Sequence, residues 1–376
     1  MRPAHGQTYS CHLSRTDRLK RGLGRRATGF VPPACVRYPC GVTARRPSLL
    51  EMPVEQAALR IARGHVRAAA RGLNRARRSG DHKGLHAFRV AIRRLRSLLR
   101  AYRPWLGRAA GKKPRRRLRK FTRATNAARD ADVQLAWLAT AAEALDLEDR
   151  PGLEWVRRRL RARRRGSRGS IGAQLSRDFT RAIERLESRF GKLEVAGNHP
   201  FRSAFVEVLG PAADRFRSRL AAIAGPDDFE NIHETRIQVK RLRYLVEPLR
   251  NVTDEARAVD KRLRKLQKIL GDLHDMQVIE ADLESAVEKA AREKARRMHG
   301  LAVGGKAKGL AQARRRDEPL GLAALAGQAR IRRDAHYEQF DQVWLADRAA
   351  ALDRELRALG ASLASGPAPG ELRNDS

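Results

Sequence analysis

Residues 86–103 read HAFRVAIRRLRSLLRAYR, and this stretch decides the fold class. Its apolar residues, from Phe88 to Tyr102, recur every three or four positions, which is the period of one face of an α-helix. Basic residues follow the same period one position later, so the two stripes lie about 100° apart around the helix. The pattern predicts a helix whose cationic side chains stand at the edge of the packed interior. This cationic stripe comprises His86, Arg89, Arg93, Arg96, Arg100 and Arg103.

The same pattern occurs a second time along the chain. Residues 233–243 read HETRIQVKRLR and align without a gap with HAFRVAIRRLR at 86–96. A later block also recurs, in which basic residues spaced three or four apart precede an Arg-Asp pair at 129–130 and a His-Asp pair at 274–275. Two blocks in the same order in each half predict an internal duplication of a helical unit, with its boundary near Gly197.

The composition restricts both the fold class and the kind of binding partner that we expect. The chain has 376 residues, with 80 Lys and Arg against 42 Asp and Glu, and a formal net charge of +38. Such an excess of positive charge predicts a polyanionic partner. Hydrophobic residues make up 42% and aromatic residues 5% of the sequence, which favours an all-α fold with an Ala/Leu core. No apolar run reaches the roughly 18 residues that a membrane span needs, so we expect no membrane partner.

The apolar period begins near Val54 and ends near Leu359. We therefore expect one helical domain, preceded by a disordered or spurious extension and followed by a disordered tail. The Gly- and Lys-rich stretch after Gly300 predicts a flexible loop. The expected segments are 1–51 (extension), 52–359 (domain, with halves 52–196 and 197–359), about 300–318 (loop) and 360–376 (tail).

The cationic stripes suit a polymer of phosphate. An Arg side chain offers a planar fork that fits two phosphate oxygens, and Lys offers a movable point charge. Four stripes, two in each half, place many basic groups along one surface, which suits a repeating anion better than a small metabolite. Because aromatic residues are few, the sequence lacks the stacking platform that single-stranded nucleic acid usually requires.

Four segments resemble motifs of the CHAD domain, a conserved-histidine α-helical domain associated with binding of inorganic polyphosphate. They are residues 86–96, 128–133, 233–244 and 266–275, in the order that the family shows. The resemblance implies an all-α fold of two helical bundles, related by a pseudo-twofold axis, with a central basic cavity that holds the anion. The polyphosphate-binding residues that it implies are His86, Arg89, Arg93, Arg94, Arg96, His233, Arg236, Lys240, Arg241 and Arg243, with Arg116, Lys120, Arg123, Lys261, Lys265 and Lys268 around them.

Two other functions stay open, a nucleic-acid-binding or nucleoid-associated protein and an enzyme that processes polyphosphate or nucleotides. Recognition of bases would call for aromatic or amide side chains among the stripes, which have almost none. Hydrolysis would call for a carboxylate cluster that binds magnesium, whereas the acidic residues are dispersed. We therefore expect binding without catalysis, no cofactor, and nucleic acid only as a secondary partner.

The pair His274-Asp275 resembles the metal-binding dipeptide of HD-type phosphohydrolases. Arg129 stands at the corresponding position of the first half, where a metal site would need a ligand such as His. We therefore predict no metal site, and expect Asp130 and Asp275 to face neighbouring arginines or backbone groups.

His86 and His233 begin the cationic stripes of the two halves. Neither motif contains a Ser or Cys nucleophile, so we predict no catalytic residue there. We expect both imidazoles to bind the anion and to take up protons with it, which would strengthen binding as the pH falls.

The three cysteines of the chain, Cys11, Cys35 and Cys40, all lie in the expected N-terminal extension. They cannot form a disulfide framework or a cysteine zinc site through the rest of the chain. The small number of cysteines predicts that the protein resides in the reducing cytoplasm. The resemblance to the CHAD domain implies in addition that it associates with polyphosphate granules.

Overall fold

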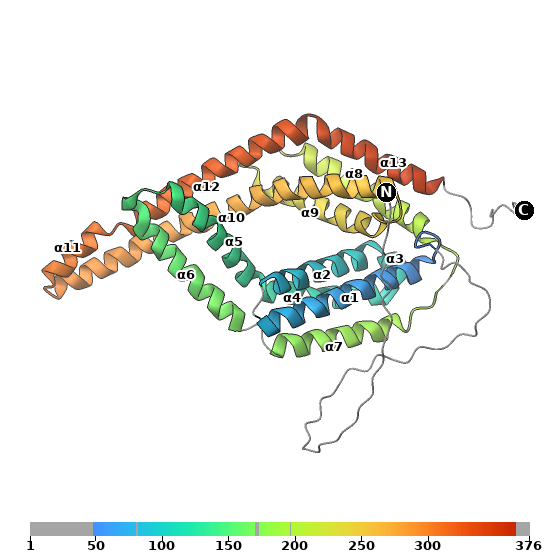
Figure 1. Cartoon of the computed structure of the whole chain (residues 1–376), viewed down its shortest axis with the longest axis horizontal. Helices are drawn as coiled ribbons and strands as arrows, with labels where there is room; N and C mark the ends of the chain where they lie inside the picture. Colours follow the sequence, from blue (N-terminus) through green and yellow to red (C-terminus); the bar gives the residue numbers. More distant parts are fainter. Residues whose placement is uncertain (1–47, 80–81, 170–172, 196, 366–376) are drawn as a thin grey trace, which may run out of the picture. The chain divides into compact units, whose positions relative to one another are not determined.

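The computed structural model describes residues 48–79, 82–169, 173–195 and 197–365 (Figure 1). Within these residues the regular elements are helices, which confirms the all-α prediction; the only β contact described is an isolated bridge between Pro53 and Pro200. Most of the expected N-terminal extension, and the tail beyond residue 365, lie outside the described residues.

The first half of the described chain contains seven α-helices. Short 3-10 turns connect some of them, and the helix pairs α1 with α2 and α5 with α6 pack closely along their lengths. The helices are α1 (Val54–Ser79), α2 (His82–Ala101), α3 (Arg103–Leu106), α4 (Lys112–Ala124), α5 (Asn126–Ala141), α6 (Arg150–Gly169) and α7 (Ala173–Phe190).

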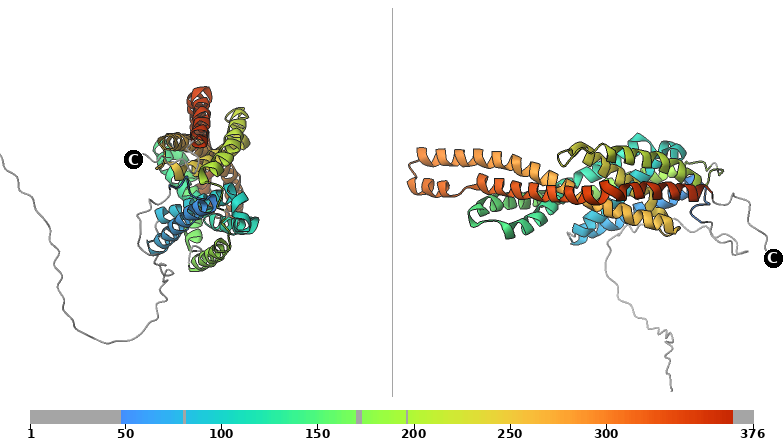
Figure 2. Two further views of the ribbon diagram at one scale, coloured as in Figure 1. Left: turned by 90° about the vertical axis from the view of Figure 1, so that its right-hand side faces the viewer. Right: turned by 90° about the horizontal axis from the view of Figure 1, so that it is seen from above.

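The described part of the second half contains six α-helices. The long α10 packs against both α9 and α12, and Figures 1 and 2 show α10 and α12 side by side. A π-helical segment, Asp341–Arg348, continues α12 into α13. The helices are α8 (Phe201–Ala221), α9 (Phe229–Val246), α10 (Asp254–Val303), α11 (Ala307–Arg315), α12 (Glu318–Phe340) and α13 (Ala349–Ala364).

The prediction of a flexible loop over about 300–318 is wrong. Helix α10 continues to Val303, the chain turns at Gly304 and Gly305, and α11 follows. Gly305 has a φ of 65°, a left-handed conformation that glycine adopts without a steric penalty. The Gly-rich composition therefore marks a tight turn between two helices. The last helix also extends beyond residue 359, to Ala364.

The apolar stripe of residues 86–103 is buried as predicted. Phe88, Ile92, Leu95 and Leu99 have no exposed surface, and Tyr102 is 1% exposed. The ring of Phe88 packs edge-on against those of Phe121 in α4 and Phe179 in α7. The stripe thus joins α2 to the other helices of its half, and the cationic side chains lie along the border of this core.

Two hydrophobic clusters form the interior, and each combines helices from both halves. The larger contains residues of α1, α2, α4, α7, α8, α9, the first part of α10, and α13. The smaller contains residues of α5, α6, the middle of α10, and α12. None of the helices in the described ranges is long and apolar enough to cross a membrane.

The order of the helices is consistent with the predicted duplication, which stays a prediction. In each half a helix pair, α1–α2 or α8–α9, precedes the segment that carries the later block. That segment is broken at Thr125 into α4 and α5 in the first half and continuous as α10 in the second.

Candidate functional site

Arg89 is the most buried of the predicted basic ligands, at 7% exposure. Its Nη1 donates to the carbonyl oxygen of Thr122 at 3.1 Å and to Oγ1 of Thr125 at 2.9 Å. These groups lie where α4 ends, and the Thr122 carbonyl also accepts a hydrogen bond from the backbone N–H of Thr125 at 3.3 Å. Burial lowers the pKa of Arg89 to about 10, and the side chain stays charged at neutral pH. Arg89 therefore stabilises the fold as well as contributing positive charge.

Five basic side chains from α2, α9 and α10 lie together, and we call them the central basic cluster: Arg93, His233, Arg236, Lys240 and His274. The charge of Arg93 acts on both Arg236 and Lys240, although Arg93 belongs to the other half of the chain. The rings of His233 and His274 have centroids 4.9 Å apart. The structure thus brings together first-half and second-half residues that the sequence placed on separate stripes.

The cations of the central basic cluster are poorly neutralised by the protein. Among the described residues, no salt bridge is formed by Arg93, Arg236 or Lys240. The Nε atoms of both arginines are buried and have no hydrogen-bond acceptor in the described part of the chain. Buried donors without acceptors and adjacent like charges are both unfavourable, so an anion that satisfies them would bind with a substantial gain.

The pKa values reflect this crowding. Burial, together with the charges of Arg236 and Arg93, lowers the pKa of Lys240 to about 6. Burial and the charge of Arg236 lower the pKa of His274 to about 3. The pKa of His233 is also lowered, by burial first and then by Arg236. At neutral pH, Lys240 and both histidines of the cluster are therefore largely uncharged.

Two aspartates face the predicted ligands in equivalent positions of the two halves. Asp130 of α5 interacts with Arg89, and Asp275 of α10 interacts with Arg236. In both, burial raises the carboxyl pKa and the arginine opposes the shift. These placements match the expectation that the aspartates face arginines.

Helix α5 also contributes Arg129, which is not among the predicted polyphosphate ligands. The pKa of His86 is lowered by burial, and among the neighbouring charges Arg129 has the largest effect, ahead of Arg93. The charge of Arg129 also reaches Asp275 of α10. Arg129 therefore connects the first-half histidine with the central basic cluster.

An arginine row continues the basic surface from α2 onto α4. We define it as Arg96, Arg100, Arg115, Arg119 and Arg123. Burial, together with the charges of the other four, lowers the pKa of Arg96 to about 10. The α2 side of the row begins one helical turn after Arg93, so the row extends the central basic cluster.

Helix α9 joins the same surface through Arg241. Burial lowers the pKa of Arg241, and the charge of Arg100 acts in the same direction. Its Nη1 donates to Oε1 of Gln238 at 3.2 Å. The predicted ligand Arg241 is thus placed beside the arginine row, across from α2.

Two predicted ligands, Arg94 and Arg243, are instead held in an ion-pair network around Glu247. Arg94 forms a short ion pair with Glu247, and Arg243 Nη2 lies 3.5 Å from the same carboxylate. Arg250 and Arg264 lie 3.8 and 3.9 Å from it. Glu247 is only 12% exposed, so this network ties α2, α9 and α10 together with its charges compensated. Arg94 and Arg243 are consequently less available to an external anion than the central basic cluster.

Replacing Glu247 with Gln should destabilise the protein. The change removes the carboxylate charge shared by Arg94 and Arg243 and leaves their guanidinium groups partly buried without it. We expect a loss of about 1–3 kcal/mol in the free energy of unfolding, measured by urea denaturation. Glu288→Gln, at an exposed pair with Arg292 on α10, is the matched control and should change stability little. Equal stabilities of the two variants would contradict a structural role for the network.

The predicted residues of the later blocks lie on exposed faces. Lys261, Lys265 and Lys268 are exposed on α10, and Lys268 Nζ lies 2.6 Å from Oδ2 of Asp272. The charge of Lys268 also reaches His336 of α12.

On α4, the structure brings Arg123 to the arginine row and leaves Arg116 and Lys120 exposed. The other α4 neighbours of Arg96 are Arg115 and Arg119, which are not among the predicted ligands. Arg115 and Arg119 each precede a predicted ligand, Arg116 or Lys120, by one residue, and both pairs lie beside the same buried residues of α4. The sequence therefore contains a second possible cationic stripe on this helix, but it does not show which side of the helix faces α2.

The site offers charge and hydrogen-bond donors. Within the described ranges, no group of three or more His, Cys, Asp or Glu side chains converges as a metal site would require. The arrangement can therefore hold an extended anion by contacts from α2, α4, α5, α9 and α10.

The comparisons with known proteins agree with this architecture. The family model of the CHAD domain matches residues 60–284, which include all the motif segments quoted above. The crystal structure of the CHAD domain from the plant Ricinus communis is similar with a TM-score of 0.57 and 20% sequence identity, covering 85% of this chain and 94% of that one. No curated protein sequence matches the chain. Because the family model matches more than half of the sequence, this protein belongs to the CHAD domain family.

Proposed function

We propose that the protein binds inorganic polyphosphate, without catalysis, across the central basic cluster and the arginine row. The observation that carries the proposal is the presence of Arg93, Arg236 and Lys240 side by side without salt bridges in the described structure. Such a site is destabilised when empty and stabilised by an anion with closely spaced charges. Membership of the CHAD family, which is linked to polyphosphate, supports the same ligand.

The length of the basic surface favours a polymer over a single phosphate. The central basic cluster and the arginine row follow one another along α2, and α4, α9 and α10 add charges on either side. A chain of phosphates can contact both regions at once, whereas a small anion can occupy only one. Association with polyphosphate granules in the cytoplasm would follow from such binding and forms part of the proposal.

We expect tight, reversible binding of long-chain polyphosphate that weakens steeply with salt. Binding releases counterions condensed on the polymer, so the logarithm of the affinity should fall linearly with the logarithm of the salt concentration. Isothermal titration from about 50 to 400 mM salt measures the slope. A flat response would contradict the electrostatic account.

A competition experiment separates polyphosphate from nucleic acid. Labelled polyphosphate bound to the protein is titrated with duplex DNA of equal phosphate concentration at one fixed salt concentration. We expect DNA to compete weakly, because its phosphates lie farther apart than those of polyphosphate and the described site offers few groups for reading bases. Displacement by DNA at equal or lower concentration would instead favour a nucleic-acid-binding protein.

A further inference from the structure

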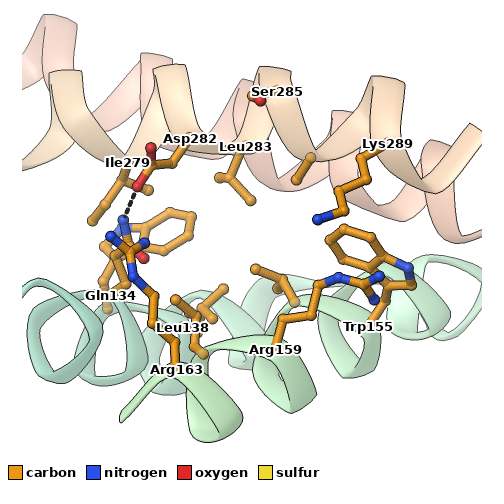
Figure 3. A pocket seen from close by; sticks show the side chains of 14 residues that line it. Gln134, Leu138, Trp155, Arg159, Arg163, Ile279, Asp282, Leu283, Ser285 and Lys289 are labelled. Atoms are coloured by element: carbon orange, nitrogen blue, oxygen red, sulfur yellow. Dashed lines mark hydrogen bonds between the residues drawn. The ribbon is translucent and has the colours of Figure 1, made fainter. Parts of the chain in front are cut away.

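A cavity of about 220 Å³ lies between α5 and α6 on one side and α10 on the other (Figure 3). It shares no lining residue with the central basic cluster or the arginine row. Its apolar lining includes Leu138, Leu160, Ile279 and Leu283, all part of the smaller hydrophobic cluster. The cavity is larger than the roughly 150 Å³ that holds a benzene ring, so it has room for a bicyclic ring system.

One wall of the cavity is fixed by Glu293 of α10. Trp155 Nε1 donates to Oε2 of Glu293 at 3.2 Å, and Arg159 forms a short ion pair with the same carboxylate. The guanidinium carbon of Arg159 lies 3.8 Å from the centroid of the Trp155 ring. This wall is therefore ordered before a ligand enters, which reduces the entropy lost on binding.

A second tryptophan brings an unused hydrogen-bond donor to the cavity. Trp137 lines it, is 7% exposed, and has a buried Nε1 without an acceptor in the described part of the chain. A buried N–H without an acceptor costs about 1–3 kcal/mol. A ring nitrogen or exocyclic oxygen of a bound ligand would remove that cost.

The polar lining of the cavity is predominantly cationic. Arg163 of α6 and Lys289 of α10 are exposed, and neither forms a salt bridge with any of the described residues. In Figure 3, Lys289 reaches toward Trp155 from the opposite helix. The carboxylate in the lining, Asp282, already accepts a hydrogen bond from Gln134. In the same view, Arg163 lies beside Gln134, at the opposite end of the cavity from Lys289, and its charge acts on the carboxyl of Asp130. Lys289 therefore remains available to an anionic group.

We propose that this cavity binds a purine nucleoside monophosphate. The purine ring fits between the apolar side chains and offers an acceptor to Trp137 Nε1, and the phosphate lies at Lys289. A ring without phosphate would leave Lys289 unused, and a phosphate without a ring would leave the apolar volume empty. The site is independent of the proposed polyphosphate site, because the two share no residue.

Titrations of the full-length protein with three probes test the ligand class. Intrinsic tryptophan fluorescence, excited at the red edge where AMP does not absorb, follows AMP, adenosine and ribose 5-phosphate in parallel. We expect saturable quenching by AMP, affinity for adenosine lower by about tenfold, as expected for loss of one charge-assisted contact, and no saturable signal from ribose 5-phosphate. Equal affinity for AMP and ribose 5-phosphate, or no saturation with AMP, would overturn the proposal.

Variants locate the site by isothermal titration with AMP. Lys289→Gln and Trp137→Phe should each raise the Kd by about tenfold, since each removes one contact. Arg296→Gln, at an exposed residue of α10 that does not line the cavity, is the matched control and should leave the Kd unchanged. Equal Kd values for the Lys289 and Arg296 variants would overturn the assignment.

A variant of the central basic cluster tests whether AMP binds there instead of in the cavity. A protein with Arg93→Gln and Lys240→Met should keep full AMP affinity, because neither residue lines the cavity. Loss of AMP binding in that variant would place the nucleotide in the central basic cluster and refute the cavity site, whatever the outcome with polyphosphate.

Discussion

Replacing Arg93 with Gln and Lys240 with Met should weaken polyphosphate binding by roughly 100-fold or more and raise the melting temperature of the free protein. Each substitution removes a cation that the anion contacts, and a hydrogen bond to a charged group contributes about 1.5–3 kcal/mol. Two such losses amount to roughly 3–6 kcal/mol, or a factor of about 100 to 10,000 in affinity. Isothermal titration at one salt concentration measures the change.

The increase in stability has a separate physical origin. In the free protein Arg93 lies beside Arg236 and Lys240 without a salt bridge in the described structure, so its charge repels that of Arg236 and disfavours protonation of Lys240. Removing it relieves this repulsion, and the isosteric Met keeps the volume of Lys240 while removing a poorly solvated amine. Thermal unfolding followed by circular dichroism should therefore show an increase in melting temperature while binding is lost.

A control with the same change in net charge makes this result specific. Arg158→Gln with Arg161→Gln also removes two cations, from exposed positions on α6. We expect it to reduce affinity only slightly, through long-range electrostatics. If the two double variants bound polyphosphate equally, net charge alone would account for binding and the assigned site would be wrong.

Polyphosphate affinity should increase by roughly 100-fold between pH 8 and pH 6, with uptake of about one proton for each molecule bound. The pKa of Lys240 is about 6 in the free protein, and a bound polyanion favours its charged form and raises that pKa. Between the free and complexed pKa values, each pH unit then changes affinity about tenfold per proton. Below pH 6 the contribution of Lys240 levels off, because the free protein is protonated as well.

The histidines extend this dependence to lower pH. His274 has a pKa of about 3, and the pKa values of His233 and His86 are also lowered, in each case first by burial. The sequence predicts a pH dependence through His86 and His233, and the structure adds Lys240 and His274. Titration calorimetry in two buffers with different ionisation enthalpies counts the protons directly.

Variants separate the contribution of Lys240 to the pH dependence of binding from that of the histidines. Lys240→Met should remove most of the increase between pH 8 and pH 6, whereas His233→Gln with His274→Gln should reduce mainly the increase at lower pH. A parent protein whose affinity did not change with pH would exclude proton uptake by these groups on binding.

The stability of the free protein should change in the opposite direction. A base whose pKa is lower in the folded than in the unfolded state binds its proton preferentially in the unfolded state. For Lys240, stability therefore falls as the pH decreases from 10.5, the ordinary pKa of a lysine in the unfolded chain, to about 6 and then levels off. For His274 the corresponding window runs from 6.5 to about 3. Bound polyphosphate should counteract both losses.

The helix type and the buried face could be predicted from local sequence patterns. The three- and four-residue period around Phe88 identified a helix and its buried side, since side-chain direction repeats with the turn of the backbone. The stretch after Gly300 was misinterpreted because glycine favours both a flexible loop and a tight turn, and the choice depends on the packing of the flanking helices.

The candidate site was only partly predictable. His86, Arg93, His233, Arg236 and Lys240 lie where the stripes placed them, at the border of the core. The participation of Arg115, Arg119 and Arg129 depended on which flank of α4 and α5 faces α2, and a stripe pattern does not contain that information.

The sequence by itself determined that the chain is helical, that its helices carry adjoining apolar and cationic stripes, and that its formal net charge is +38. Only the tertiary structure decided which cations are available. Arg93 and Arg94 are neighbours in sequence, yet Arg94 is neutralised by Glu247 of the other half, whereas Arg93 lies against Arg236 and Lys240. Helical periodicity is a property of neighbouring residues, but the charge state and partners of a side chain depend on groups that folding brings from distant parts of the chain.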